Sequence, residues 1–141
     1  MADALARLLA ESEVRRTIAE YCQCCDDGRF DEFGECFAPD AVVVVMGREV
    51  VGREAIVAWI SKAMPAEKRG KHVTINPLIT IAPDGMQATA GVDYLFVAKS
   101  GSGPHMTTAG RYLDVFTPHA DRWVFARREI TFLGDGPGSS G

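Results

Sequence analysis

The residues that could perform chemistry are ionisable side chains set in otherwise apolar stretches of the sequence. Tyr21 and Asp26 lie near the end of one such stretch, and His72 opens another, with Asn76 four residues after it. Asp93 stands in the middle of a third, Val-Asp-Tyr-Leu-Phe. An aspartate beside a histidine forms a general acid/base pair, because the carboxylate fixes the imidazole tautomer and raises its basicity. A tyrosine hydroxyl can then polarise a substrate carbonyl.

Each of these residues also has an ordinary structural role open to it. Asp26 can be a loop residue at a helix end, Tyr21 a core residue with a hydrogen-bonded hydroxyl, and the histidine a satisfied strand-end residue. Asp93 can pair with an arginine such as Arg111 or Arg128. Because these residues are far apart in the sequence, composition alone leaves both interpretations open.

The four cysteines do not form a recognisable metal or redox motif. Cys22, Cys24, Cys25 and Cys36 contain one C-x-x-C spacing, and neither a second pair nor histidines at ligand spacing follow it. A redox C-x-x-C opens a helix, whereas this pair lies near the end of a helical pattern. We therefore expect small buried thiols in a reduced compartment, with no metal and no cofactor.

Composition limits the classes of partner. The chain has 141 residues, 47% hydrophobic and 24% charged, which suits one globular domain without a bilayer-spanning segment. A net charge of −4 argues against nucleic acid as a partner, and the basic run at 68–71 suits a solvated loop. The N-terminus lacks the features of a secretory signal, so we expect neither export nor membrane association and place the protein in the cytoplasm.

Hydrophobic periodicity predicts the elements that must position the candidate residues. Three- and four-residue spacing indicates helices over 5–25, with Ser12 capping a second helix after a short first one, and over 31–37 and 52–64. A β-branched run at 41–45 and a short strand at 49–51 predict a hairpin. Alternation then predicts four antiparallel strands at 72–82, 86–99, 105–117 and 122–133.

This order predicts an α+β domain over 1–133, with helices packed on a strongly curved, mostly antiparallel sheet around an apolar pocket. The tail 134–141 has no apolar residue and is expected to be disordered. The later strands are apolar on both faces, and one helical layer covers only one face. We therefore expect the other face to meet a second subunit.

Several short segments together resemble the SnoaL-like proteins of the cone-shaped superfamily that includes nuclear transport factor two and scytalone dehydratase. The resemblance covers about residues 5 to 133 and rests on Glu13 to Tyr21, Asp26, Phe30-Asp-Glu-Phe33, Cys36 to Ala41, Gly52-Arg-Glu-Ala-Ile56, His72-Val-Thr-Ile-Asn76 and Gly110-Arg-Tyr-Leu-Asp114. It implies a curved sheet and helices that form a cone-shaped barrel around a blind pocket, commonly in a homodimer. It does not imply one reaction.

The resemblance also assigns residues by position. Members that dehydrate or isomerise polyketide, steroid or bile-acid-like compounds use a pocket Asp–His pair with a tyrosine, which match Asp26, His72 and Tyr21. The looser matches, expected to line or brace the substrate pocket, are Asn76, Asp93 and Arg128, and we add Trp59 from the inward side of the helix at 52–64.

These inferences predict a cofactor-independent lyase or isomerase, of dehydratase or cyclase type, for a small apolar oxygenated ring compound. His72, oriented by Asp26, moves the proton and Tyr21 stabilises the enolate oxygen. The alternative is a non-catalytic ligand-binding or structural subunit with the same fold. The motif patterns of ketosteroid isomerase and of the limonene epoxide hydrolases are not evident.

Overall fold

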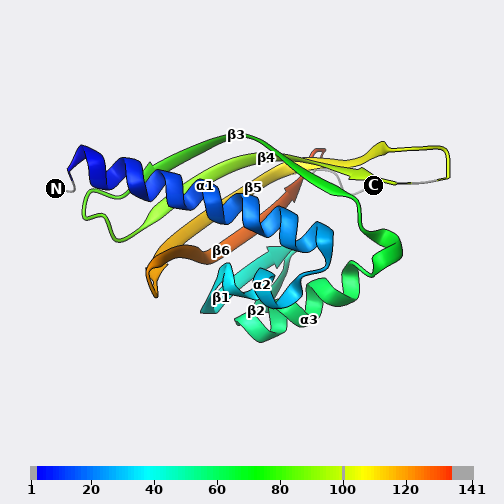
Figure 1. Ribbon diagram of the computed structural model, residues 1–141, viewed down its shortest axis with the longest axis horizontal. Coiled ribbons are helices and arrows are strands. Elements are labelled where there is room, and N and C mark those ends of the chain that lie inside the picture. Colours follow the sequence, from blue (N-terminus) through cyan, green and yellow to red (C-terminus); the bar gives the residue numbers. More distant parts are fainter. Residues whose placement is uncertain (1–2, 100, 135–141) are drawn as a thin grey trace.

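The computed structural model describes residues 3–99 and 101–134, and its elements run in the order shown in Figure 1. They are α1 (Ala4–Asp27), α2 (Phe30–Glu35), β1 (Phe37–Val45), β2 (Arg48–Val51), α3 (Arg53–Ala63), a 3₁₀ turn (Ala66–Lys68), β3 (Lys71–Ile81), β4 (Ala88–Ala98), β5 (His105–His119) and β6 (Arg122–Phe132). Of the predicted tail, Gly134 is described and 135–141 lie outside the described residues.

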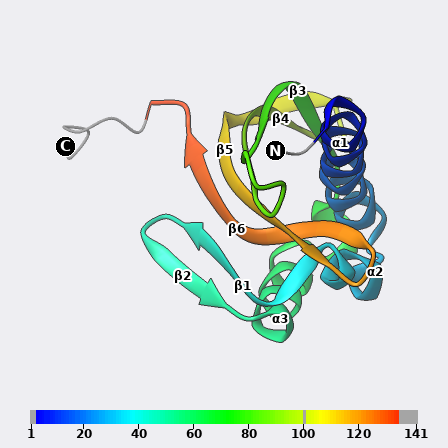
Figure 2. The same cartoon turned by 90° about the vertical axis from the view of Figure 1, so that its left-hand side faces the viewer.

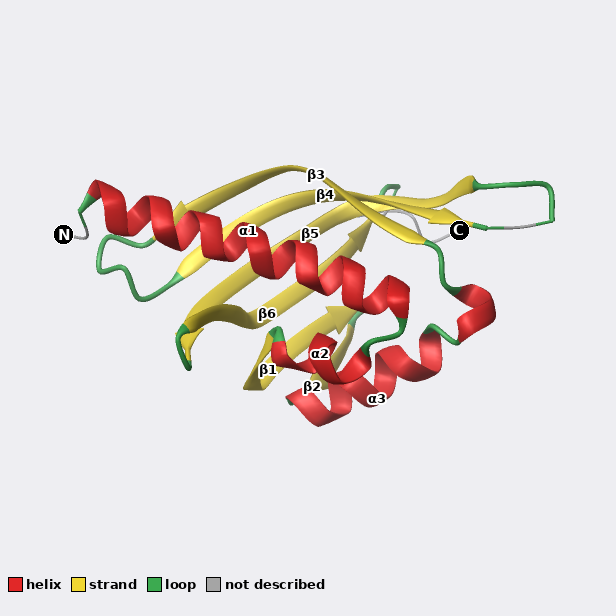
Figure 3. Ribbon diagram, in the orientation of Figure 1, coloured by secondary structure: helices red, strands yellow, loops and turns green. Residues whose placement is uncertain are grey.

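The strands form one mixed sheet in the order β2-β1-β6-β5-β4-β3. All neighbours are antiparallel except β1 and β6, which run parallel. The sheet bends strongly, and α1 lies across its concave side (Figure 2). Figure 3 shows the shorter helices α2 and α3 near β1 and β2. The α+β class and the curved, mostly antiparallel sheet are confirmed, although the sheet does not close into a full barrel.

Residues 4–27 form one long helix rather than the two that were expected. The segment around Ser12 contains no glycine or proline, and serine inside a helix costs only a fraction of a kcal/mol, roughly 0.5 relative to alanine. Asp3 caps the helix instead, because its side chain accepts from the Ala6 backbone N–H at 2.7 Å. Gly28 ends the helix in the left-handed conformation, at φ 73°.

α1 is fixed to the sheet by polar contacts as well as by its apolar face. The Thr17 hydroxyl donates to the Trp123 carbonyl at 2.6 Å, and Arg122 pairs with Glu20 at 2.6 Å. Between these layers lies a continuous aromatic and aliphatic core that includes Tyr21, Phe33, Phe37, Val92, Tyr112, Phe116 and Phe125. The C-terminal half of α1 is therefore held at a defined distance from the sheet.

β1 begins earlier than the predicted strand at 41–45, and the helix before it ends earlier than predicted. Phe37, expected at the end of that helix, pairs with Phe125 of β6. The register then shifts between Phe37 and Val42, a stretch that contains Pro39. Proline cannot donate to a ladder, so an interruption at this point follows from its chemistry.

β3 contains a bulge between Ile75 and Leu78, at the Asn76-Pro77 step. Asn76 adopts a positive φ of 51°, which asparagine tolerates better than most residues. The irregularity interrupts the alternation of the strand and leaves Asn76 exposed.

Candidate active site

Asp26 and His72 meet at the end of α1 nearest the start of β3. The His72 Nδ1 lies 2.6 Å from Asp26 Oδ1, and the His72 backbone N–H donates to both carboxylate oxygens at 3.0 and 3.1 Å. The side chains are 3% exposed for Asp26 and 12% exposed for His72. The expectation that these two residues lie within hydrogen-bonding reach, 46 positions apart, is confirmed.

The elements on either side hold the pair in place. Asp26 belongs to the last turn of α1, just before the Gly28 cap. His72 is the second residue of β3, after a loop whose Arg69 donates from Nε to the Met64 carbonyl at 3.1 Å and lies over the Phe30 ring. The geometry of the pair therefore depends on how α1 ends and how the 64–71 loop is anchored.

The hydrogen bond determines which imidazole nitrogen is available for proton transfer. A carboxylate only accepts, so the neutral imidazole carries its proton on Nδ1 and has its lone pair on Nε2. The His72 ring lies 4.8 Å from the Phe96 ring and 6.3 Å from the Tyr21 ring, centroid to centroid. Both of those rings line the cavity that His72 also lines.

This cavity has a volume of about 190 Å³ and lies between α3, the end of α1 and the concave side of the sheet. Its lining is aromatic and aliphatic, with few polar groups, and contains neither lysine nor arginine: Tyr21, Val45, Trp59, Ile60, Met64, His72, Tyr94, Phe96, Thr108, Tyr112, Ile130 and Phe132. Such a lining suits a neutral ring compound more than a carboxylate or a phosphate ester.

Tyr21 and Trp59, both expected at the site, line this cavity. Tyr21 is 2% exposed and its ring packs 4.9 Å from the Phe33 ring. Burial raises the pKa of its hydroxyl well above the usual value, and the charge of Arg128 opposes that rise. The hydroxyl is therefore a neutral hydrogen-bond donor at ordinary pH.

Asn76 and Asp93, also expected near the substrate, do not line the cavity. Asn76 is exposed at the β3 bulge. Asp93 lies on the convex face, because Val92 and Tyr94 on either side of it point into the core. It accepts from Arg111 Nε at 2.6 Å, and this hydrogen bond lowers the pKa of Asp93. The pairing with Arg111 is one of the ordinary roles considered above.

Arg128 lies beneath the cavity rather than in its lining. Its side chain is fully buried and donates from Nε and Nη2 to the two carboxylate oxygens of Asp114, at 2.8 and 2.7 Å. The guanidinium carbon lies 4.2 Å from the centroid of the Tyr21 ring and 3.7 Å from that of Tyr112. Arg128 therefore braces the pocket without reaching a ligand.

Sequence reasoning missed Tyr112, Asp114 and the inward role of Tyr94. A signal for them was present, because alternation along Gly110-Arg-Tyr-Leu-Asp114 puts Tyr112 and Asp114 on one face. An acidic residue on a core face requires a buried partner, and Arg128 on the neighbouring strand supplies it.

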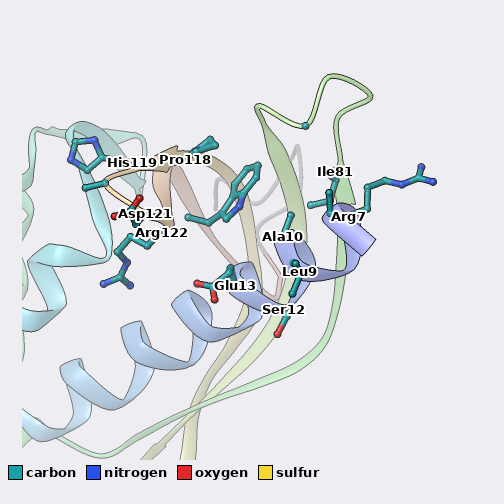
Figure 4. A pocket seen from close by; sticks show the side chains of 14 residues that line it. Arg7, Leu9, Ala10, Ser12, Glu13, Ile81, Pro118, His119, Asp121 and Arg122 are labelled. Atoms are coloured by element: carbon teal, nitrogen blue, oxygen red, sulfur yellow. The ribbon is translucent and has the colours of Figure 1, made fainter. Parts of the chain in front are cut away.

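A larger cavity, of about 750 Å³, lies at the opposite end of α1, beside the β5–β6 turn. Figure 4 shows that the side chains of Arg7, His119 and Arg122 around it point away from one another. Arg122 is paired with Glu20. Without converging polar groups this cavity offers no catalytic arrangement, and the Asp26–His72 pair is far from it in the fold.

In residues 3–99 and 101–134, no group of three or more His, Cys, Asp or Glu side chains is placed to hold a metal ion. No helix in the same residues is both long and apolar enough to cross a bilayer.

A family model for the SnoaL-like domain matches residues 6–129. The chain belongs to the SnoaL-like domain family. A search of the curated proteins finds no match in sequence.

Solved structures share the fold of this SnoaL-like chain. A nuclear transport factor two-like protein with a cystatin-like fold from Novosphingobium aromaticivorans is 24% identical, with a TM-score of 0.84 over 96% of this chain and 94% of its own. A candidate scytalone dehydratase from that organism is 20% identical, with a TM-score of 0.80 over 92% and 88%. A candidate β subunit of an aromatic-ring-hydroxylating dioxygenase, also from it, is 19% identical, with a TM-score of 0.73 over 89% and 90%.

Identities this low establish the fold alone. The fold is compatible with a dehydratase or isomerase and equally with a subunit that performs no chemistry of its own. The choice between these functions therefore depends on the residues of the site.

Proposed function

We propose that this SnoaL-like protein is a cofactor-independent lyase or isomerase for a small, neutral, oxygenated ring compound. The observation that carries the proposal is the 2.6 Å contact between His72 Nδ1 and Asp26 Oδ1 beside an aromatic cavity. In this mechanism His72 Nε2 takes a proton from the carbon next to a carbonyl. It then returns the proton to a leaving hydroxyl, which departs as water, or to another carbon of the same compound.

Tyr21 supports the charge that develops in this reaction. Removing a proton beside a carbonyl creates an enolate oxygen, and a neutral donor fixed in a dry pocket stabilises it more than water does. Tyr21 lines the same cavity as His72 and donates without ionising. The proposed base, His72, and the proposed donor, Tyr21, therefore line the same cavity, as proton abstraction from one bound compound requires.

The size of the cavity narrows the substrate class. A volume of about 190 Å³ is below the ~300–1,000 Å³ typical of pockets for drug-sized ligands. We therefore favour compounds of one or two rings over the steroid or four-ring polyketide class.

The test is a screen of one- and two-ring hydroxyketones for loss of water or double-bond migration. His72→Ala is expected to lower the rate on the order of 10²-fold or more, and Asp26→Asn to lower it as well. Ligand affinity, measured by calorimetry, should change little in either variant. His119→Ala is the matched control, because His119 is exposed and far from the cavity.

Turnover that persists in both the His72→Ala and Asp26→Asn variants would contradict the assignment of the base. Ligand binding without turnover of any compound by the unmodified protein would favour the non-catalytic role instead.

A further inference from the structure

Arg128 sits inside a stack of aromatic rings that reaches the cavity. The Tyr94 and Tyr112 rings are stacked at 4.2 Å with an interplanar angle of 4°, and the guanidinium of Arg128 lies over the Tyr112 ring at 3.7 Å. The same guanidinium is 4.2 Å from the centroid of the Tyr21 ring. The guanidinium of Arg128 thus contacts the rings of Tyr21 and Tyr112. Both of these tyrosines line the cavity that His72 also lines.

The ion pair beneath these rings uses only one edge of the Arg128 guanidinium. Asp114 takes the Nε and Nη2 edge of the guanidinium, which leaves Nη1 on the side away from the carboxylate. Among the described residues, Nη1 is the buried side-chain nitrogen or oxygen that has no hydrogen-bond partner. The Nη1 edge of the guanidinium therefore points away from Asp114 and has no hydrogen-bond acceptor among the described residues.

The tyrosine hydroxyls differ in whether they are already engaged. Tyr94 donates to the Thr131 carbonyl at 3.2 Å. Tyr112 makes no side-chain hydrogen bond to another described residue. Arg128 Nη1 is a fully buried atom without a partner, and the Tyr112 hydroxyl is not. Tyr112 is 2% exposed and lines the cavity, so its hydroxyl, unlike that of Tyr94, is left to bind a ligand there.

Burial keeps both cavity tyrosines in their neutral form. It raises the pKa of Tyr21 and of Tyr112 well above the usual value, and Arg128 lowers both by its charge. A neutral hydroxyl next to a buried cation is a strong donor, because the cation favours negative charge on whatever accepts from it.

We propose that Tyr21 and Tyr112 together form an oxyanion-binding subsite of this cavity, with Arg128 as the positioning residue beneath both rings. The ligand class is a one- or two-ring phenol or enol bound as its oxyanion. The inference extends the proposed function, because an enolate formed by His72 would be bound in the same way. It can be tested without turnover.

The experiment compares two probes of nearly equal shape, 4-nitrophenol and 4-nitrotoluene, at a pH where the free phenol is ionised. Both dissociation constants are measured on the full chain by absorbance or calorimetry. The unmodified protein is expected to bind the phenolate about 10-fold or more tightly than the methyl analogue. Equal binding of the two probes would overturn the subsite.

The first variant removes the ion pair while keeping the core apolar. Arg128→Met combined with Asp114→Leu is expected to abolish the preference for the phenolate and to leave the affinity for 4-nitrotoluene unchanged. The matched control is Arg127→Gln with Glu129→Gln, which removes a half-exposed pair on the same strand. A folded double variant that keeps the full preference would show that Arg128 only supports the core.

A second set of variants covers the case in which the first does not fold. Tyr21→Phe and Tyr112→Phe remove one hydroxyl each and keep the stacked rings. Each is expected to lower the preference several-fold, and no effect from either would overturn the assignment. His72→Ala should keep the preference although it is expected to lose turnover, so the oxyanion subsite and the proposed reaction succeed or fail separately.

Discussion

The Arg128–Asp114 pair is the least expected pair of residues in the core, because both side chains are fully buried. Burying two charges carries a desolvation cost that their mutual attraction often only balances. Burial raises the pKa of Asp114, and Arg128 opposes that rise. Such a pair adds little to net stability, and in the proposed subsite its role is to position Tyr21 and Tyr112.

The pair makes a clear prediction for stability. Arg128→Met alone and Asp114→Leu alone should each lower the free energy of unfolding by about 3–5 kcal/mol, because each leaves one buried charge without its partner. The double variant should lose much less than the sum. Urea denaturation measures all three, and additive losses would contradict strong coupling between the two residues.

The buried cysteines predict how stability depends on alkaline pH. Burial raises the pKa of Cys22 to about 11 and those of Cys25 and Cys36 to about 12, from a usual value of 9.0. The folded state thus favours the neutral thiol. This contribution is complete below pH 9 and is lost as the pH rises through about 11 to 12.

We therefore expect the free energy of unfolding to decline above pH 9, measured by urea denaturation. At pH 8 the thiols of the folded protein should react slowly with an alkylating reagent, whereas all four react in denaturant. Fast labelling of the folded protein would show that these thiols are not enclosed.

At the scale of elements, the geometry of the Asp26–His72 pair depends on one glycine at the end of α1. Gly28 has φ 73°, and a Cβ added there would lie 2.4 Å from the Arg69 guanidinium. Arg69 anchors the loop that leads into His72. Gly28→Ala should lower the free energy of unfolding by the left-handed strain of ~1–2 kcal/mol plus the effect of displacing Arg69.

Gly47→Ala separates these two effects. Gly47 has the same φ of 73° in the β1–β2 turn, and an added Cβ there meets no atom within 4 Å. This variant should show the strain alone and leave ligand binding unchanged. Equal losses in the two variants, by urea denaturation, would mean that Arg69 moves aside freely.

Local patterns in the sequence were sufficient for most elements. Helical spacing and the Asp26-Asp27-Gly28 end placed the carboxylate at a helix terminus, and alternation placed His72 at the start of a strand. The predicted bounds of the four long strands lie within a few residues of the bounds in the structure. Their antiparallel pairing was predicted because short turns join neighbouring strands. That the two catalytic candidates meet came from the family resemblance.

The remaining features depend on contacts between distant segments. The parallel pairing of β1 with β6 links strands about 80 residues apart along the chain, and no local turn encodes it. The bulge at Asn76-Pro77 exposes Asn76 where a regular strand would not. Asp93 was expected near the pocket from the family resemblance and its apolar neighbours. Its strand carries apolar residues on both faces, and this hides from the sequence which face is the inner one.

At the scale of the whole molecule, no helix in residues 3–99 and 101–134 covers the convex face of the sheet. Val73 on β3 and Leu113 on β5 point outward, since His72 and Asp114 beside them point inward, and they are 40% and 45% exposed. Apolar side chains gathered on a sheet face commonly mark a contact with another chain. We propose that a second copy of this chain covers this face.

The prediction is a homodimer in solution, with about twice the chain mass by light scattering at micromolar concentration. Leu113→Lys should shift the mass toward that of one chain, because each dimer would bury a new charge on both sides of the interface. Leu8→Lys is the matched control: Leu8 is 63% exposed on α1, away from the convex face, and its replacement should leave the dimer intact. The cavity that contains His72 is lined by residues of the concave side, so a monomeric Leu113→Lys variant should still bind the ring compounds that the unmodified protein binds. If the unmodified protein is a monomer at all concentrations, the convex face meets solvent and the prediction is wrong. If both variants lose the dimer equally, the contact between subunits involves α1 instead.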